Sequence, residues 1–311
     1  NLSGLAFLHV PKTGTAFINS LLTIGCPGIT EEEHDDLKVT GPNQIRDWMA
    51  NLSSKCLDGF NFCNGNFASH IPIVEGNMPA NACNNWDQHK GQFFGMFRIP
   101  EQRIISAYHN GKHSFYGKYA NYSRNTKADR NISLEYFARG SRGCAVKMMT
   151  GNWMIPKLRL VAACAWTSEV NYLPSKEMVQ LAVHRLRTGF RFVGLVEEWD
   201  LSVCLLHAMF GGECHAREFR AERSAKPAAM RQLRKAWDTA PLHGVKDEYD
   251  AELYRQARSI FWANVKKYKV DEWSCRKICP HFPERGPDGS AALLKVSPDA
   301  ADEDFDAIDV I

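Results

Sequence analysis

A short polar segment near the start of the chain has the residue types of a phosphate-binding loop. It follows an apolar run and contains, in order, His9, Val10, Pro11, Lys12, Thr13, Gly14, Thr15 and Ala16. The lysine supplies a mobile positive charge, the threonines supply hydroxyl donors, and the glycine lets the backbone approach a ligand closely. A helix that starts here adds unpaired N–H groups and the positive end of its dipole. The segment from Pro11 to Ala16 therefore predicts an anion site.

This segment is not the Walker A loop of nucleotide triphosphatases. That pattern requires Gly-x₄-Gly-Lys-Ser/Thr, whereas here Lys12 precedes the only glycine of the segment. A nucleotide-dependent phosphotransferase of the P-loop kinase type is therefore the alternative enzyme class and not the favoured one. The same residues also fit an ordinary strand-to-helix turn that binds nothing.

A second candidate anion site follows a later apolar run. Arg98 stands at the end of that run, Pro100 suits the first turn of a helix, and Ser106 falls nearly two turns further on. Ligands of parallel sheets bind at the carboxyl ends of strands, so Arg98 and Ser106 are expected to converge on a second anion. Taken alone, the pattern also fits an amphipathic helix with a surface arginine.

Strands alternate with helices around these two motifs. Short apolar runs bounded by turn residues predict strands at 5–10, 92–99 and 190–196. Helical spacing of apolar residues predicts helices at 16–22, from Pro100 onward, and at 133–150, 176–188, 201–210, 228–237 and 247–268. The alternation predicts an α/β protein with a P-loop-like three-layer fold, in which helices flank a central parallel sheet.

The composition suits one large globular domain. The chain has 311 residues, of which 44% are hydrophobic, which is enough to bury a sizeable core. Residues 1–280 are expected to form this single domain, and residues 281–311 a linker and an acidic tail without fixed structure. The formal net charge of +3 argues against nucleic acid as a partner, while a mildly basic body suits smaller anionic ligands.

Cysteines and glycosylation sequons favour an oxidising compartment. The chain has 10 cysteines but no Cys-x₂-Cys pairs at zinc spacing, so disulfides are expected and a metal is not. Asn-x-Ser sequons begin at Asn1, Asn51, Asn121 and Asn131. No apolar run is long enough to span a membrane, so attachment is expected only through an N-terminal anchor ahead of Asn1.

The two anion motifs together resemble those of the sulfotransferases that use 3′-phosphoadenosine-5′-phosphosulfate (PAPS). The closest resemblance is to the Golgi carbohydrate branch that includes heparan sulfate 2-O- and 6-O-sulfotransferases. Members of this branch open with a strand, Pro-Lys-Thr-Gly and a helix, and later have Arg-Asp-Pro followed by x-x-Arg-x-x-Ser-x-Tyr. Here the second motif has Ile99 in place of Asp and otherwise reads Arg98, Pro100, Arg103, Ser106 and Tyr108.

The resemblance implies roles for individual residues. The first loop would hold the 5′-phosphosulfate of PAPS, with Lys12 stabilising the leaving group, while Arg98 and Ser106 would hold the 3′-phosphate. The donor without its sulfuryl group, 3′-phosphoadenosine-5′-phosphate (PAP), would be the product, and no metal would take part. His70 would be the general base, because a histidine occupies this interval in those enzymes and imidazole titrates near neutral pH. Glu75 and His89 remain alternative bases.

The resemblance also implies a late basic loop and a carbohydrate acceptor. The loop would close over the 3′-phosphate or grip an anionic acceptor through Arg220, Arg223, Ser224 and Lys226, although a solvated helix face is the alternative. The acceptor would be a hydroxyl, with a glycan favoured over a non-sugar alcohol or a tyrosine, and the location would be the Golgi lumen. A non-catalytic glycan-binding protein is the remaining alternative, and the oligomeric state stays open.

Overall fold

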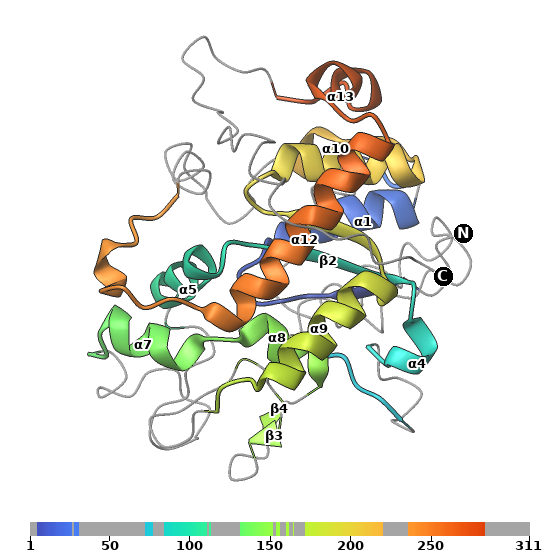
Figure 1. The fold of residues 1–311 in the computed structure, drawn as a ribbon. Helices are drawn as coiled ribbons and strands as arrows, with labels where there is room; N and C mark the ends of the chain where they lie inside the picture. The colour runs from blue at the N-terminus through green and yellow to red at the C-terminus, as the bar shows by residue number, and fades with distance from the viewer. Residues whose placement is uncertain are drawn as a thin grey trace.

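The computed structural model has a parallel sheet at its centre with helices on its faces (Figure 1). It describes residues 5–26, 28–30, 72–76, 84–110, 112, 131–151, 154–155, 160–161, 164, 172–219 and 236–283. Three strands form the sheet in the order β1-β2-β5, with bounds Ala6–Leu8, Phe93–Phe97 and Phe190–Leu195. The prediction of an α/β fold with a central parallel sheet is confirmed.

The strands are short apolar runs that are almost wholly buried. Ala6 of β1 lies opposite Phe93 of β2, and Gly95 of β2 lies opposite Val193 of β5, with every pairing parallel. Phenylalanine rings stack between neighbouring strands, as between Phe94 and Phe192. Because both faces of such a sheet are covered, its strands are continuous hydrophobic segments without alternation. All three strands of this sheet lie inside the predicted ranges.

Helices connect and cover these strands. A 3₁₀ turn η1 leads into α1, and α5 and α10 follow β2 and β5 directly (Figure 1). The main helices are α1 (Ile18–Gly25), α4 (Trp86–His89), α5 (Pro100–His109), α7 (Leu134–Ser141), α8 (Cys144–Thr150), α9 (Lys176–Gly189), α10 (Trp199–Phe210), α12 (Glu248–Lys267) and α13 (Glu272–Ile278). The remaining short elements are η1 (Thr15–Phe17), η4 (Ala216–Phe219), η5 (Ala240–Leu242) and the hairpin of β3 (Met154–Ile155) and β4 (Leu160–Val161).

One range that was predicted as a single helix is interrupted in the structure. The range 133–150 is two helices, α7 and α8, separated at Arg142 and Gly143. Gly143 has a φ of 68°, in the left-handed region that interrupts an α-helix and that glycine adopts without steric cost. The prediction at 228–237 falls on undescribed residues as far as 235, and residues 236 and 237 are not helical.

Disulfides fix several of these elements. Among the described cysteines, Cys144 bonds to Cys164, Cys204 of α10 to Cys275 of α13, and Cys214 to Cys279. Cys26 is also disulfide-bonded. The prediction of disulfides is confirmed. Over the same ranges, no helix has the length and apolar character of a transmembrane segment.

Candidate active site at the carboxyl edge of the sheet

The two predicted anion motifs lie side by side at the carboxyl edge of the sheet. Because β1 and β2 are parallel neighbours, the segments that follow them meet there. The Arg98 guanidinium donates from Nη1 to the backbone carbonyl oxygen of Lys12 over 3.3 Å. This hydrogen bond joins the two motifs directly.

The first loop is a tight turn with two residues in the left-handed region. Lys12 has a φ of 69° and Gly14 a φ of 87°. The turn is closed by Thr13, whose hydroxyl donates to the Val10 carbonyl over 2.8 Å. The proton of this hydroxyl is thus used inside the turn, which differs from the outward donor that the sequence suggested.

The helix that follows the loop starts at the site. The first hydrogen bond runs from the Phe17 N–H to the Gly14 carbonyl, 3.0 Å away. The N–H groups of Thr15 and Ala16 precede that bond and have no partner within the helix, as at every helix start. These two groups give the edge of the sheet a local positive potential beside Arg98.

Trp199 packs against the loop and fixes its position. A Cβ atom placed on Gly14 would lie 2.6 Å from Cζ3 of the Trp199 ring, so no larger residue fits without movement. The indole N–H donates to the Glu218 carbonyl over 2.9 Å, and the ring meets Phe17 edge-on. Trp199 begins α10 directly after β5, so the third strand of the sheet also contributes to the site.

Glu197 is the carboxylate that most strongly favours the charged form of Arg98 among the described residues. Its Oε1 accepts from the Ile99 N–H over 2.9 Å, and its Oε2 accepts from the Tyr254 hydroxyl over 3.1 Å. Burial lowers the pKa of Arg98, and the charge of Glu197 opposes that effect. Burial raises the pKa of Glu197, against the Ile99 N–H and the charge of Arg98. The carboxylate thus favours the charged form of the guanidinium.

Arg98 retains unused donor capacity. Its Nε is buried without a hydrogen-bond partner among the described residues. A buried arginine N–H that lacks a partner is costly, and an anion with oxygen acceptors would satisfy it. Ser106 lies in α5, is buried, and has no hydrogen bond to Arg98 in the described structure. The convergence of Arg98 and Ser106 on one anion stays a prediction.

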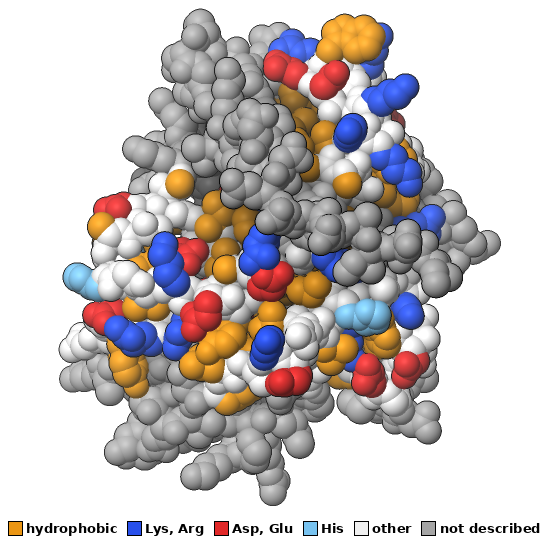
Figure 2. Space-filling model, in the orientation of Figure 1, with side chains coloured by type: hydrophobic (Ala, Val, Ile, Leu, Met, Phe, Trp, Pro, Cys, Tyr) orange, Lys and Arg blue, Asp and Glu red, His pale blue; other side chains and the backbone are white. Residues whose placement is uncertain are grey.

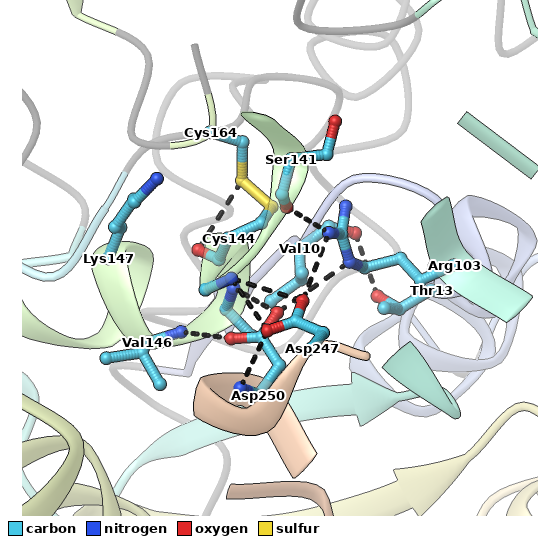
Figure 3. The surroundings of a disulfide bond; sticks show 12 residues. Val10, Thr13, Arg103, Ser141, Cys144, Val146, Lys147, Cys164, Asp247 and Asp250 are labelled. Carbon is cyan, nitrogen blue, oxygen red and sulfur yellow. Dashed lines mark hydrogen bonds and ion pairs between the residues drawn. A yellow bond between two sulfur atoms is a disulfide. The ribbon is translucent and has the colours of Figure 1, made fainter. Parts of the chain in front are cut away.

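Arg103, from the second motif, belongs to a buried charged cluster (Figure 3). It donates to the Ser141 carbonyl over 2.7 Å and lies 3.9 Å from Asp247 and 3.8 Å from Asp250. Both carboxylates accept from the N-terminal N–H groups of α8, including those of Gly143, at 2.9 Å, and of Ala145, at 3.0 Å. The cluster joins α5, α8 and α12.

Burial shifts the pKa values of groups in and beside this cluster. Burial, together with the neighbouring charge of Asp250, raises the pKa of Asp247 to about 8, although Arg103 opposes the shift. Burial also lowers the pKa of Lys147 to about 8, against the attraction of the two carboxylates. Figure 3 shows the Lys147 side chain extending away from them, and its ammonium lies 4.7 Å from the centre of the Tyr172 ring.

Glu75 and His89 lie at the opposite edge of the sheet. The His89 ring contacts Phe93, the first residue of β2, and Glu75 pairs with Arg185 shortly before β5 begins. Figure 1 shows α4 and α5 at opposite ends of β2. A five-residue strand is about 13 Å long, so neither side chain reaches a substrate at the Lys12 loop. As alternative general bases, both are disfavoured by this position.

His207, Cys214 and Cys279 come together in the interior but do not form an open metal site. The two sulfur atoms are bonded to each other. The Nε2 of His207 contacts Glu218 at 2.9 Å, and its Nδ1 faces the Gly211 carbonyl at 3.2 Å. Burial alone would lower the pKa of His207, but the hydrogen bond and charge of Glu218 outweigh it and raise the pKa. The two cysteines thus form a disulfide, and His207 beside them forms a buried ion pair with Glu218.

Several predicted site residues lie outside the described ranges. These are the proposed base and the late basic loop, namely His70, Arg220, Arg223, Ser224 and Lys226. The described site contains Trp199 and Tyr254, which the sequence did not indicate. It also contains Glu197, whose carboxylate accepts hydrogen bonds from the Ile99 N–H and the Tyr254 hydroxyl. The only sequence signals for these residues were their positions: Glu197 and Trp199 follow β5, and Tyr254 lies within the long amphipathic helix α12. No family model, characterised protein or solved structure matches this chain.

Proposed function

We propose that this chain is a PAPS-dependent sulfotransferase that acts on an acceptor hydroxyl, with a carbohydrate as the favoured acceptor. What supports the proposal most is the contact of Arg98 with the Lys12 carbonyl. It brings a basic strand end and a Lys-Thr-Gly loop together at one edge of a parallel sheet, where a donor with two separate anionic groups would bind. The P-loop-like character of the fold is part of the same proposal.

The donor half of the reaction follows from charge. The loop N–H groups and Lys12 would neutralise the phosphosulfate end of the donor, and Arg98 would neutralise its separate 3′-phosphate. The charge of Glu197 favours the charged form of Arg98. Such preorganised donors stabilise charge that develops during the reaction without reorganising at that moment.

The proposed transfer step is an in-line displacement at sulfur. The acceptor oxygen forms a bond to sulfur while the bond from sulfur to the 5′-phosphate oxygen breaks, and PAP leaves with that electron pair. Lys12 would stabilise the charge on the leaving oxygen, and His70 would take the proton of the acceptor hydroxyl. The assignment of His70 follows from the resemblance to the Golgi enzymes.

Donor binding is the first test of the proposal. Isothermal titration with PAP should show binding by the wild-type chain, and thermal shift should show stabilisation by PAP but not by ATP with Mg²⁺. Lys12→Ala should weaken PAP binding by about tenfold or more, since it removes a charge-assisted contact. Lys90→Ala is the matched control, because Lys90 lies over Trp86 at the opposite edge of the sheet. Stabilisation by ATP with Mg²⁺ alone would indicate a phosphotransferase instead.

Transfer of labelled sulfate is the second test. The acceptors should include a desulfated glycosaminoglycan, a simple alcohol and a tyrosine peptide, read out by mass spectrometry. His70→Ala should abolish transfer while PAP affinity is retained, because a general base acts on the acceptor and not on the donor. Normal turnover in both Lys12→Ala and His70→Ala would refute the mechanism. Donor binding without transfer to any acceptor would favour a non-catalytic role.

A further inference from the structure

The short helix α13 presents an unusually exposed tryptophan. The side chain of Trp273 is 67% exposed, whereas the next most exposed large hydrophobic residue in the described structure, Tyr136, reaches 42%. Lys277, one turn later on α13, places its ammonium 3.3 Å from the centre of the Trp273 ring. Exposure of a flat apolar ring to water is unfavourable, so such a residue indicates a binding surface when other features support one.

Two disulfides make α13 rigid. A seven-residue helix is marginal by itself, but Cys275 is bonded to Cys204 of α10 and Cys279 is bonded to Cys214. The start of the helix is closed by reciprocal hydrogen bonds between Asp271 and Ser274, at 2.7 and 2.8 Å. Trp273 therefore stands on a fixed support, which reduces the entropy lost when a ligand orders it.

The surroundings of Trp273 are basic. Figure 2 shows Lys and Arg side chains gathered at the top of the molecule, over α13 and the end of α12. The only acids between residues 266 and 277 are Asp271, which caps its own helix, and Glu272, which pairs with Arg276 at 3.0 Å. We call the following exposed residues the α13 surface: Lys266, Lys267, Tyr268, Lys269, Trp273, Arg276 and Lys277.

We propose that the α13 surface binds an anionic polysaccharide, one whose sugars bear sulfate or carboxylate groups. A sugar ring would stack on the face of Trp273, and the surrounding ammonium and guanidinium groups would pair with its anions. This site needs no donor nucleotide and uses none of the residues of the proposed transfer reaction. The α13 surface can therefore be tested independently of that reaction.

The shape of α13 favours a polysaccharide over a lipid surface or single-stranded nucleic acid. Membrane-bound amphipathic helices have a broad apolar face, whereas the other apolar positions of α13 face the core, with Cys275 buried and Ile278 packed against the core. Strands of nucleic acid stack successive bases on several aromatic rings, whereas Trp273 is the one aromatic residue of the α13 surface that is more than half exposed.

The test is binding to dextran sulfate, with neutral dextran as the uncharged reference. Biolayer interferometry in about 0.15 M salt limits long-range charge effects, and no nucleotide is added. Trp273→Ala should weaken binding of dextran sulfate by about fivefold or more, and Lys277→Gln by about threefold. Tyr136→Ala and Arg139→Gln on α7 are the matched controls, an exposed aromatic and an exposed cation, and should leave binding unchanged.

Three results would overturn the proposal. The first is equal binding by wild type and Trp273→Ala, which would assign polyanion binding to other basic residues. The second is tighter binding to vesicles of phosphatidylserine and phosphatidylcholine than to dextran sulfate, and the third is tighter binding to an oligo-dT strand. Circular dichroism of each variant checks folding, and titration with PAP should be unaffected by Trp273→Ala, which separates this site from donor binding.

Discussion

The Arg98 guanidinium and the Lys12 carbonyl are 3.3 Å apart although the residues are separated by 86 positions in the chain. This contact crosses from the end of β2 to the loop after β1 and is possible because the two strands are parallel neighbours. It ties the position of an arginine to the conformation of a loop that has Lys12 and Gly14 in the left-handed region. Loss of the Arg98 side chain should therefore disturb both halves of the candidate site.

Replacement of Arg98 should separate its role in the site from its role in the fold. Arg98→Gln should weaken PAP binding by about tenfold or more and cost about 1–3 kcal/mol of stability, because Glu197 is left buried without its countercharge. Glu197→Gln is the matched control, since it keeps Arg98 and removes the opposing charge. That variant should bind PAP at least as tightly as wild type. The reverse order of affinities would contradict the assignment of Arg98 to the anion site.

The contact of Gly14 with Trp199 predicts a large effect of a small substitution. Gly14→Ala should destabilise the chain by about 2–4 kcal/mol, because the new methyl group would meet the Trp199 ring and the φ of 87° is unfavourable for alanine. Gly91→Ala separates the two causes, since Gly91 has a φ of 82° but nothing within 4 Å of a Cβ. Urea unfolding should show a cost for Gly91→Ala that is smaller by at least about 1 kcal/mol.

The sequence predicted the parts of the site that follow from local chemistry. Apolar runs gave the strands, and the residues after each run gave the loop at Lys12 and the arginine at position 98. Their meeting followed from one inference, that alternating strands and helices form a parallel sheet. Contacts that depend on tertiary packing were not predictable in this way, and the position of Trp199 over Gly14 is the main example.

Other features were hidden for equally physical reasons. The break between α7 and α8 depends on a left-handed φ at Gly143, and a glycine inside a helical pattern does not by itself indicate one. Glu75 and His89 were plausible bases by sequence interval, but α4 precedes β2 and therefore lies at the amino edge. Disulfide pairing is not encoded in cysteine spacing, so the anchoring of α13 to α10 came only from the fold.

The cluster of Asp247, Asp250 and Arg103 predicts a pH dependence of stability. The pKa of Asp247 is about 8 in the fold, well above its unfolded value, so the folded state binds the proton more tightly. Folding is then favoured at low pH, and this contribution is lost as pH rises from about 4 through about 8. Asp247→Asn has a permanently neutral side chain that can still accept from the Gly143 N–H.

Urea unfolding at about pH 6 and pH 8 tests this relationship. Wild type should lose about 1–2 kcal/mol more than Asp247→Asn between the two pH values, because only the wild-type side chain must ionise in the interior. The lowered pKa of Lys147 acts in the opposite direction and mainly above pH 8, so it does not account for a loss in this window. Parallel pH profiles for the two proteins would show that Asp247 is already ionised at pH 6.

The disulfides predict a graded loss of stability that non-reducing peptide mapping and unfolding can both check. Mapping should recover the three described pairs and should show Cys26 in a disulfide as well. Replacing Cys204 and Cys275 by serine should cost about 1 kcal/mol more than replacing Cys144 and Cys164. The chain-entropy cost grows with the loop that a disulfide closes, and these pairs are separated by 71 and 20 residues.

The Cys204 variant also connects stability with the α13 surface. Without its bond to α10, α13 retains only the disulfide of Cys279. Because a helix of seven residues is marginal by itself, we expect α13 to lose its helical structure. Binding of dextran sulfate should then weaken as in Trp273→Ala, although Trp273 and its neighbouring cations are all present. The Cys144 variant lacks a disulfide elsewhere in the fold and should bind normally. Equal loss in both variants would show that global unfolding, and not release of α13, reduces binding.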